Sequence, residues 1–318
     1  MFPKGEIMFT VKINELLRRK ADLTARLNLL PYYGTPEIKE NTSGKYLYVR
    51  RRESGKLKST YVGAFSEELY AALLKYSREA REINKAIRKI EKELALNGYE
   101  NGELSPDVII NLDFARANMK SSIYDQAVLE GVATTFPQTE TIIDGGIVNG
   151  VSSFDVQKIL NLKHAWEFIL DKDVLRSKSD FYILSYIAGL VNEGFYIDGG
   201  RLRGVPVKIG GSSYIPPLPI EVDVKEAIEK IESSNEDFIE IAISLCLYCM
   251  KAQLFNDGNK RTAVIFANHY LISHGGGILV IPEQNVPEFK RLLVLYYEDR
   301  DKGEIREFLR RVCIRSFS

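Results

Sequence analysis

The chain has 318 residues, of which 45% are hydrophobic, and this is enough to bury a core and to exclude a disordered or fibrous protein. Its three cysteines make neither a disulfide framework nor a four-ligand zinc site, and no apolar run reaches the roughly 20 residues that span a bilayer. The N-terminus lacks the apolar centre of a signal peptide, so we expect a cytoplasmic protein without membrane contact.

The formal net charge of zero hides an asymmetry along the chain. Residues 1–100 hold 20 Lys and Arg against 13 Asp and Glu, whereas the remainder holds 23 against 30. This indicates two differently employed regions. A stretch rich in Gly, Asn and Glu, residues 97–107, predicts the boundary between an N-terminal arm, 1–100, and a domain over 107–318.

Two apolar stripes in the arm predict a pair of helices. Between Leu69 and Leu94, apolar or small residues follow one another at alternating steps of four and three, which is a heptad seam over nearly four heptads. A weaker stripe runs from Ile13 to Leu30, with Lys20 at one seam position. The two stripes predict an antiparallel helical hairpin of coiled-coil type, and such seams also suit dimer formation through the N-terminal helices.

Between these stripes, residues 45–52 and 57–65 are rich in Tyr and Val and predict a β-hairpin with a tight turn at 53–56. Basic residues and tyrosines cluster around that turn: Arg50, Arg51, Arg52, Lys56, Lys58, Tyr46, Tyr48 and Tyr61. Such a cluster allows nucleic-acid binding through phosphate contact and base stacking. We favour the alternative, in which charged edge strands protect against aggregation.

The stretch KAQLFNDGNKRTAVIFANHY predicts a helix, a tight turn and a second helix. The backbone N–H groups of Gly258, Asn259 and Lys260 would lie at a helix N-terminus, where unpaired donors and the helix dipole favour an anion. Lys260 and Arg261 add positive charge where cations oppose the dipole, which indicates a bound polyphosphate. Asp257 beside it is a hard oxygen ligand suited to magnesium. The alternative is an N-capped helix with surface charges.

The segment QLFNDGNKR, residues 253–261, resembles the Fic/Doc family motif HxFx(D/E)GN(G/K)R at every defined position except the first. Upstream, QAVLEG at 126–131 is similar to the family's inhibitory-helix motif (S/T)xxxE(G/N). Asn161 and Ala165 resemble its recurring Asn-x-x-x-Ala helix, and residues 201–219 resemble its flap. The four features stand in the family's order over roughly residues 107–318.

The resemblance implies a mainly α fold: a Fic-type helical domain with a small β-hairpin flap, preceded by the helical hairpin that carries its own β-hairpin. It implies a protein adenylyltransferase that binds ATP and magnesium and transfers AMP to a hydroxyl of a target protein. Other members transfer phosphoryl or phosphocholine groups. By position, Asp257 would hold the metal, Gly258, Asn259 and Lys260 the anion, and Arg261 phosphate oxygens, while Phe255 would anchor the loop, Glu130 would inhibit, and Val207, Lys208 and Ile209 of the flap would align the target by strand addition.

Two departures concern the transfer step. Gln253 stands where the family has its general-base histidine, and an amide does not accept a proton near neutral pH. Val264 stands at the family's second arginine. Losing a general base costs about 10² to 10⁴ in rate, but positioning and electrostatics contribute most to phosphoryl transfer. The sequence therefore leaves open a slow transferase, with Gln253, Asp257 and Arg261 at the catalytic positions, and a lapsed nucleotide-sensing or protein-interaction module.

A Doc-like protein kinase is a further alternative. Val264 and the Lys of GNKR are nearer to the Doc branch, whose members are implied to phosphorylate an elongation factor with ATP in a different orientation. Doc-like chains are shorter and lack an attached inhibitory helix, so Glu130 favours the first two alternatives. We expect His164, His269 and His274 to be packing or surface residues that do not replace the missing base.

Overall fold

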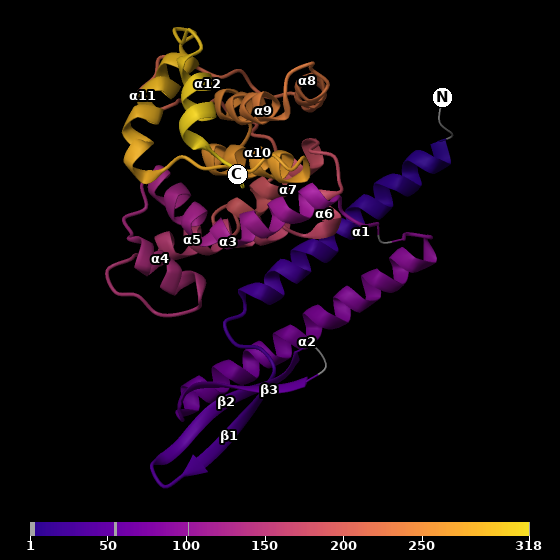
Figure 1. Cartoon of the computed structure of the whole chain (residues 1–318), viewed down its shortest axis with the longest axis vertical. Helices are drawn as coiled ribbons and strands as arrows, with labels where there is room; N and C mark the ends of the chain where they lie inside the picture. The colour runs from indigo at the N-terminus through magenta and orange to yellow at the C-terminus, as the bar shows by residue number, and fades with distance from the viewer. Residues whose placement is uncertain (1–3, 54–55, 101, 318) are drawn as a thin grey trace. The chain divides into compact units, whose positions relative to one another are not determined.

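The computed structural model describes residues 4–53, 56–100 and 102–317, and it is mainly helical with two small antiparallel sheets (Figure 1). The mainly α fold class is thereby confirmed. The chain divides into two compact units, residues 1–101 and 102–318, and each is described by itself. Within the ranges just given, no helix combines the length and the apolar character that crossing a membrane would require.

The first unit is the helical hairpin with its sheet. Its elements are α1 (Lys4–Leu29), β1 (Thr35–Asn41), β2 (Gly44–Glu53), β3 (Lys56–Ala64) and α2 (Glu67–Leu96). Leu17 of α1 clusters with Ile90 and Leu94 near the end of α2, and Lys12 pairs with Glu93 at 3.0 Å. Because the early part of α1 lies against the late part of α2, the two helices run antiparallel, as the stripes predict.

The sheet has the order β1-β2-β3, with both pairs antiparallel. The two predicted strands are present, whereas Ser54 and Gly55 of the predicted turn lie outside the described residues. β1 was not predicted, because its sequence TPEIKEN has only two β-branched residues, Thr35 and Ile38, and no aromatic one, while Pro, Glu, Lys and Asn are depleted in strands. A further difference is the buried row on α1, which consists of Leu17, Ala21 and Ala25, so the larger apolar residues of the predicted stripe lie only at its margin.

The second unit is a helical domain. Its elements are α3 (Pro106–Leu129), α4 (Phe136–Ile143), α5 (Ser153–Ile169), α6 (Lys172–Leu175), α7 (Phe181–Val191), α8 (Glu221–Glu232), α9 (Phe238–Ala252), α10 (Asn259–Ser273), β4 (Ile278–Leu279), η1 (Glu283–Asn285), α11 (Val286–Tyr297), α12 (Glu304–Phe308), η2 (Leu309–Cys313) and β5 (Ile314–Arg315).

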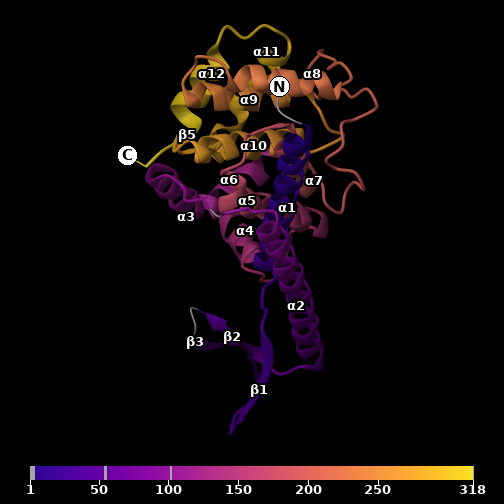
Figure 2. The ribbon, with the colours of Figure 1, turned by 90° about the vertical axis from the view of Figure 1, so that its right-hand side faces the viewer.

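Helix α10 lies at the centre of this unit. It packs against α9 on one side and against α7, α5 and α3 on the other, as both views show (Figures 1 and 2). Nearly all of its residues are buried, polar ones included, so it is a core helix without a solvent-facing stripe. The position of α10 fixes the loop that precedes it.

The expected flap differs from a β-hairpin. Residues 201–220 form no strand, and one backbone hydrogen bond, from Ser212 N–H to the Ile209 carbonyl, closes a turn within them. Val207 and Ile209 are half-buried and Lys208 is exposed. Prolines in this segment remove backbone donors, which leaves carbonyl groups that side chains must satisfy.

The arm's helical hairpin gives a stability prediction. Leu94 is 3% exposed in the cluster with Leu17, and Leu96 of the same helix is 88% exposed. We expect Leu94→Ala to lower the free energy of opening α1 and α2 by about 2 to 5 kcal/mol, because it removes buried methyl groups and leaves a cavity. The control Leu96→Ala should change it by less than about 0.5 kcal/mol. Native-state hydrogen exchange measures both, and equal effects of the two substitutions would contradict this packing.

Candidate functional site

The loop between α9 and α10 starts and ends with left-handed backbone. Gln253, after the last turn of α9, has φ 45°, and Gly258, before the first turn of α10, has φ 71°. A Cβ on Gly258 would lie 2.8 Å from both Asn192 Oδ1 and Val191 Cγ1, so only glycine fits there. The chain thus reverses sharply and starts α10 at a fixed place.

Two side chains hold the interior of this loop. Asn259 accepts a hydrogen bond from the Phe255 N–H at 2.9 Å and donates one to the Phe255 carbonyl at 2.8 Å. Phe255 itself is buried in the core. Asn192 donates to the Asp257 carbonyl at 3.0 Å. The Asn259 side chain is therefore a structural part of the loop, and what this residue offers a ligand is its backbone N–H.

The N-terminus of α10 has no side-chain cap, unlike those of α3, α5, α7 and α9, where Ser or Asp accepts from the first turn. The first N–H groups of a helix have no partner inside it, and the dipole makes this end positive. Here they are those of Asn259, Lys260 and Arg261. The structure thus brings the predicted anion-binding residues together at one uncapped helix end.

Arg261 is a deeply buried charge of the candidate site, at 2% exposure. Its Nη1 donates to the Val191 carbonyl at 3.3 Å and its Nη2 to Asp257 Oδ2 at 3.2 Å. The Asp257 side chain is itself exposed. Since Gln126 of α3 also donates to the Arg261 carbonyl at 2.8 Å, the first turn of α10 is fixed from two sides.

Glu130 follows directly on α3 and reaches the same helix end. Its carboxylate oxygens lie 3.5 Å from Lys260 Nζ and 3.7 Å from Arg261 Nε. Glu130 Oε1 and Arg261 Nε are buried, and neither has a hydrogen-bond partner within the described residues. Val264, at the position of the family's second arginine, is buried one turn further along α10. Glu130 therefore faces the cations of the motif itself.

The side-chain donor of Gln253 is bound to α9 and not to the N-terminus of α10. Its Nε2 donates to the Met250 carbonyl of α9 at 2.6 Å, which satisfies one of the free carbonyls at that helix C-terminus. Its own carbonyl accepts from Arg203 Nε at 2.5 Å. The residue that replaces the family's histidine thus takes part in the structure of the loop.

Arg203 is one of two residues around the candidate site that sequence reasoning missed. Its guanidinium is buried and donates to the carbonyls of Gln253, Val205, Pro216 and Pro217, at 2.5 to 3.1 Å, while its N–H donates to the Leu254 carbonyl. Burial lowers the pKa of this guanidinium. Arg203 therefore ties both ends of the flap to the motif, and the only indication in the sequence is an arginine among prolines that provide no N–H.

The asparagine of the Asn-x-x-x-Ala helix, Asn161, donates to the carbonyls of Val191 and Glu193, at 3.1 and 2.8 Å. It thereby supports the end of α7, on which Asn192 and the Gly258 turn depend. Sequence reasoning missed Asn192, whose only indication was a polar residue directly after an apolar helix. Asn161 and Asn192 therefore support the loop through backbone carbonyls.

The residues present fit a magnesium nucleotide better than a metal held by protein alone. In the parts of the chain that the structure describes, no three His, Cys, Asp or Glu side chains come together as a metal site. Asp257 is a single exposed carboxylate beside an uncapped helix end. Magnesium is commonly held by one or two carboxylates together with substrate phosphates, which matches this arrangement.

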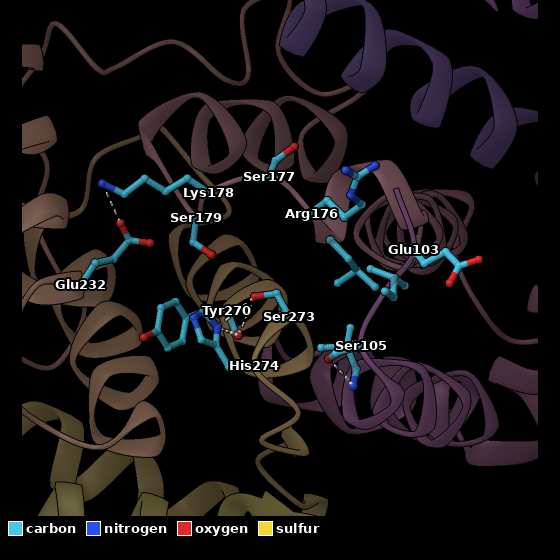
Figure 3. Close-up of a pocket in the computed structure, with 13 residues that line it drawn as sticks. Glu103, Ser105, Arg176, Ser177, Lys178, Ser179, Glu232, Tyr270, Ser273 and His274 are labelled. Carbon is cyan, nitrogen blue, oxygen red and sulfur yellow. Dashed lines mark hydrogen bonds and ion pairs between the residues drawn. The ribbon is translucent and has the colours of Figure 1, made fainter. Parts of the chain in front are cut away.

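A cavity of about 630 Å³ lies at the C-terminal end of α10, away from the Gly258 loop (Figure 3). Lys178 points toward Glu232 across it, at 3.3 Å, and His274 stacks on Tyr270. The 15 residues of α10 place it about 22 Å from the Gly258 loop. The cavity is therefore not part of the candidate site.

The histidines do not supply a base. His269 is fully buried, and its Nε2 donates to the Val174 carbonyl at 2.9 Å. Because Nε2 carries the proton of the neutral ring, Nδ1 accepts from the Ser179 hydroxyl at 2.8 Å. His164 is buried and lies 3.2 Å from Glu193, and His274 is at the C-terminal end of α10.

The Fic/DOC family model matches residues 182–271, and residues 11–71 match the domain of unknown function DUF6788. The chain is 27% identical over 233 residues to the protein adenylyltransferase Fic of Drosophila willistoni, covering 69% of this chain and 45% of that protein. For the corresponding protein of Drosophila mojavensis the values are 26% over 198 residues, 59% and 38%. The chain thus spans less than half the length of these curated relatives.

Two solved structures share the fold. A Fic family protein from Desulfovibrio desulfuricans G20 aligns with a TM-score of 0.52 at 17% identity, covering 66% of this chain and 73% of that one. A Fic domain containing signaling protein from Bacteroides thetaiotaomicron aligns with a TM-score of 0.51 at 16% identity, covering 65% and 85%.

The buried His269 gives a pH prediction. Burial lowers its pKa to about 4, so the unfolded chain binds the proton more readily between about pH 6.5 and pH 4. The stabilisation that the neutral ring provides is complete above that window and falls by about 3 kcal/mol across it. We expect denaturant unfolding of His269→Gln to lack this part of the acid dependence. The exposed-site control His274→Gln should retain it, and an unchanged slope in His269→Gln would contradict the assignment.

Proposed function

We propose that this chain, whose residues 182–271 match the Fic/DOC family model, binds ATP and transfers AMP to a hydroxyl side chain of a target protein, at a rate lowered by Gln253. One observation carries the proposal. The N-terminus of α10 has no protein cap, and the Arg261 guanidinium and the Asp257 carboxylate lie beside it, 3.2 Å apart. That is the equipment for holding a polyphosphate and its magnesium.

The phosphates are held by the first N–H groups of α10 and by Arg261. A phosphate oxygen at this helix end replaces Asp257 or Glu130 as the partner of the guanidinium. This exchange leaves the buried charge compensated, which matters because an unpaired buried charge is costly. When magnesium is bound, it neutralises phosphate charge beside Asp257.

The transfer step requires a target hydroxyl to attack the α-phosphorus while pyrophosphate leaves. Gln253 is an amide whose Nε2 donates a hydrogen bond to the Met250 carbonyl, so it does not take the hydroxyl proton. The proton passes to solvent water as the bond between the α-phosphorus and the pyrophosphate oxygen breaks. Positioning at the helix end still aids the reaction, because the transition state is loose. The expected outcome is slow turnover, reduced by about 10² to 10⁴ relative to a site with a base.

Glu130 regulates the site by competing with phosphate. Its carboxylate lies within 3.7 Å of both motif cations, Lys260 and Arg261, whereas Val264 offers no arginine for it. A nucleotide phosphate that pairs with these cations meets like charge on Glu130 and has to displace it. Removing the carboxylate therefore strengthens nucleotide binding.

The target segment docks beside the flap. Residues at the base of the flap, Tyr214, Leu218 and Ile220, line a largely apolar cavity of about 680 Å³ together with Leu254, directly after Gln253. Leu218 is 50% exposed and Ile220 is 61% exposed. The irregular flap keeps free backbone groups for a target strand.

A catalytically lapsed nucleotide sensor is the second candidate. The bond from Gln253 Nε2 to the Met250 carbonyl favours it, because a side chain occupied in capping α9 is poorly placed to orient a substrate hydroxyl. A Doc-like kinase is the third, and Val264 favours it. The three candidate functions differ in the group transferred from ATP: the AMP transferase transfers the α-phosphorus, the kinase transfers the γ-phosphorus, and the sensor transfers neither.

Nucleotide binding is tested by calorimetric titration with magnesium and ATP. We expect Arg261→Ala to weaken binding by more than about 1 kcal/mol, because a charge-assisted contact to phosphate is lost. The control Arg291→Ala removes an exposed arginine paired with Glu288 and should leave the affinity unchanged. Circular dichroism checks that Arg261→Ala is folded, and Arg261→Lys keeps the charge if it is not. Equal affinities of all variants would exclude the helix end as the phosphate site.

Turnover is tested by incubation with ATP labelled at the α-phosphate or at the γ-phosphate, with label in protein as the readout. Slow AMP transfer predicts α-label in the natural chain, more in Glu130→Gly, and most in Gln253→His. Label in Gln253→His alone identifies the lapsed sensor. Label from the γ-phosphate alone identifies a kinase and excludes AMP transfer.

A further inference from the structure

The sheet of the first unit has two chemically different faces. On β2, Leu47 and Val49 are buried in a cluster with Leu73 of α2. Successive side chains of a strand point to opposite faces, so the alternate residues of β2 point away from the helix. They are Tyr46, Tyr48, Arg50 and Arg52.

The outward face carries an aromatic cluster that the core does not need. Tyr48 lies opposite Tyr61 of β3, with ring centroids 5.4 Å apart, and Tyr46 lies 6.2 Å from Tyr61. Tyr61 is 53% exposed. The inward face is already filled by other aromatic residues, which include Tyr32, Phe65, Tyr70 and Tyr76. On the outward face, Tyr61 is exposed and the half-buried Tyr46 and Tyr48 lie against it.

The outward face also carries cations. Residues 35–64 of the whole sheet hold seven Lys and Arg against three Asp and Glu, and three of these cations, Lys39, Arg50 and Arg52, alternate onto the outward face. Lys39 lies 4.3 Å above the Tyr48 ring, and Arg50 lies opposite Ser59 of β3. The acidic residue on this face, Glu37, is 3.8 Å from Lys39 and accepts from the Ser59 hydroxyl, so its charge is compensated.

A separate cavity of about 370 Å³ lies between the sheet and α2, where residues 50–52 of β2 meet Ser77, Ala80, Arg81 and Asn84. Arg81 donates to the Ser77 hydroxyl at 3.2 Å. This cavity is on the helix side of the sheet and is therefore not part of the outward face.

We propose that this outward face binds single-stranded nucleic acid, with bases stacked on the tyrosines and phosphates paired with the arginines. Aromatic rings stack on any base whose face is free, and alternate cations attract the backbone. A duplex hides its base faces, and an acidic peptide would use the cations and leave the tyrosines idle. The surface is independent of the ATP site, which belongs to the other unit.

The test uses the full chain and fluorescein-labelled oligothymidine of about 16 nucleotides, the upper end of site sizes for single-strand-binding folds. Fluorescence anisotropy measures affinity between about 50 and 200 mM salt. We expect Tyr61→Ala to weaken binding at least about fivefold, and Tyr61→Phe, which keeps the ring, to bind like the natural chain. Arg50→Ala with Arg52→Ala should lower the slope of log affinity against log salt by about 1.4.

The matched control is Arg88→Ala with Lys89→Ala, which removes the same charge from exposed positions on α2. It should leave the slope unchanged. Heparin and a duplex of the same length serve as competitors that offer phosphate or sulfate charge without free base faces. The proposal is overturned if oligothymidine does not bind at the lowest salt. It is equally overturned if Tyr61→Ala binds unchanged, or if heparin and duplex compete as well as unlabelled oligothymidine, since each result describes a general polyanion surface.

Discussion

The close packing of Gly258 against Asn192 is the constraint on which the candidate site depends. With φ at 71° and no room for a Cβ, the chain turns into α10 without any side chain that caps it. Asn192 also holds the Asp257 carbonyl, so the carboxylate comes to lie beside the free N–H groups. The position of Arg261 in the first turn follows from the same start. One tight contact thus leaves the N-terminus of a buried helix without a side-chain cap.

The charges around that end are compensated within the protein. Arg261 is buried, and two carboxylates from different elements, Asp257 and Glu130, lie within 3.7 Å of it. A buried guanidinium requires such partners, and a phosphate satisfies it equally well. Under the proposed function, compensation of the cations by these carboxylates and their competition with a nucleotide are therefore the same interaction.

The fold of the first unit was predictable where the pattern is local. Heptad spacing in α1 and α2 depends only on helix periodicity, and both helices are present. β1 was not predictable, because Thr35–Asn41 becomes a strand through its pairing with β2. The structure also changed which interpretation of the basic tyrosine cluster we favour. Sequence alone favoured protected edge strands, but it could not separate the face toward α2 from the face toward solvent.

By itself, the sequence determined the turn after Gln253 and the helix that starts at Asn259, because a turn and the helix that follows it depend on neighbouring residues. Tertiary structure alone decided the rest. Glu130 meets Arg261 across 131 positions, Arg203 ties the flap to Gln253, and Gln253 itself caps α9. Such pairings depend on how helices pack, and burial gives each polar group only the partners that packing brings within reach.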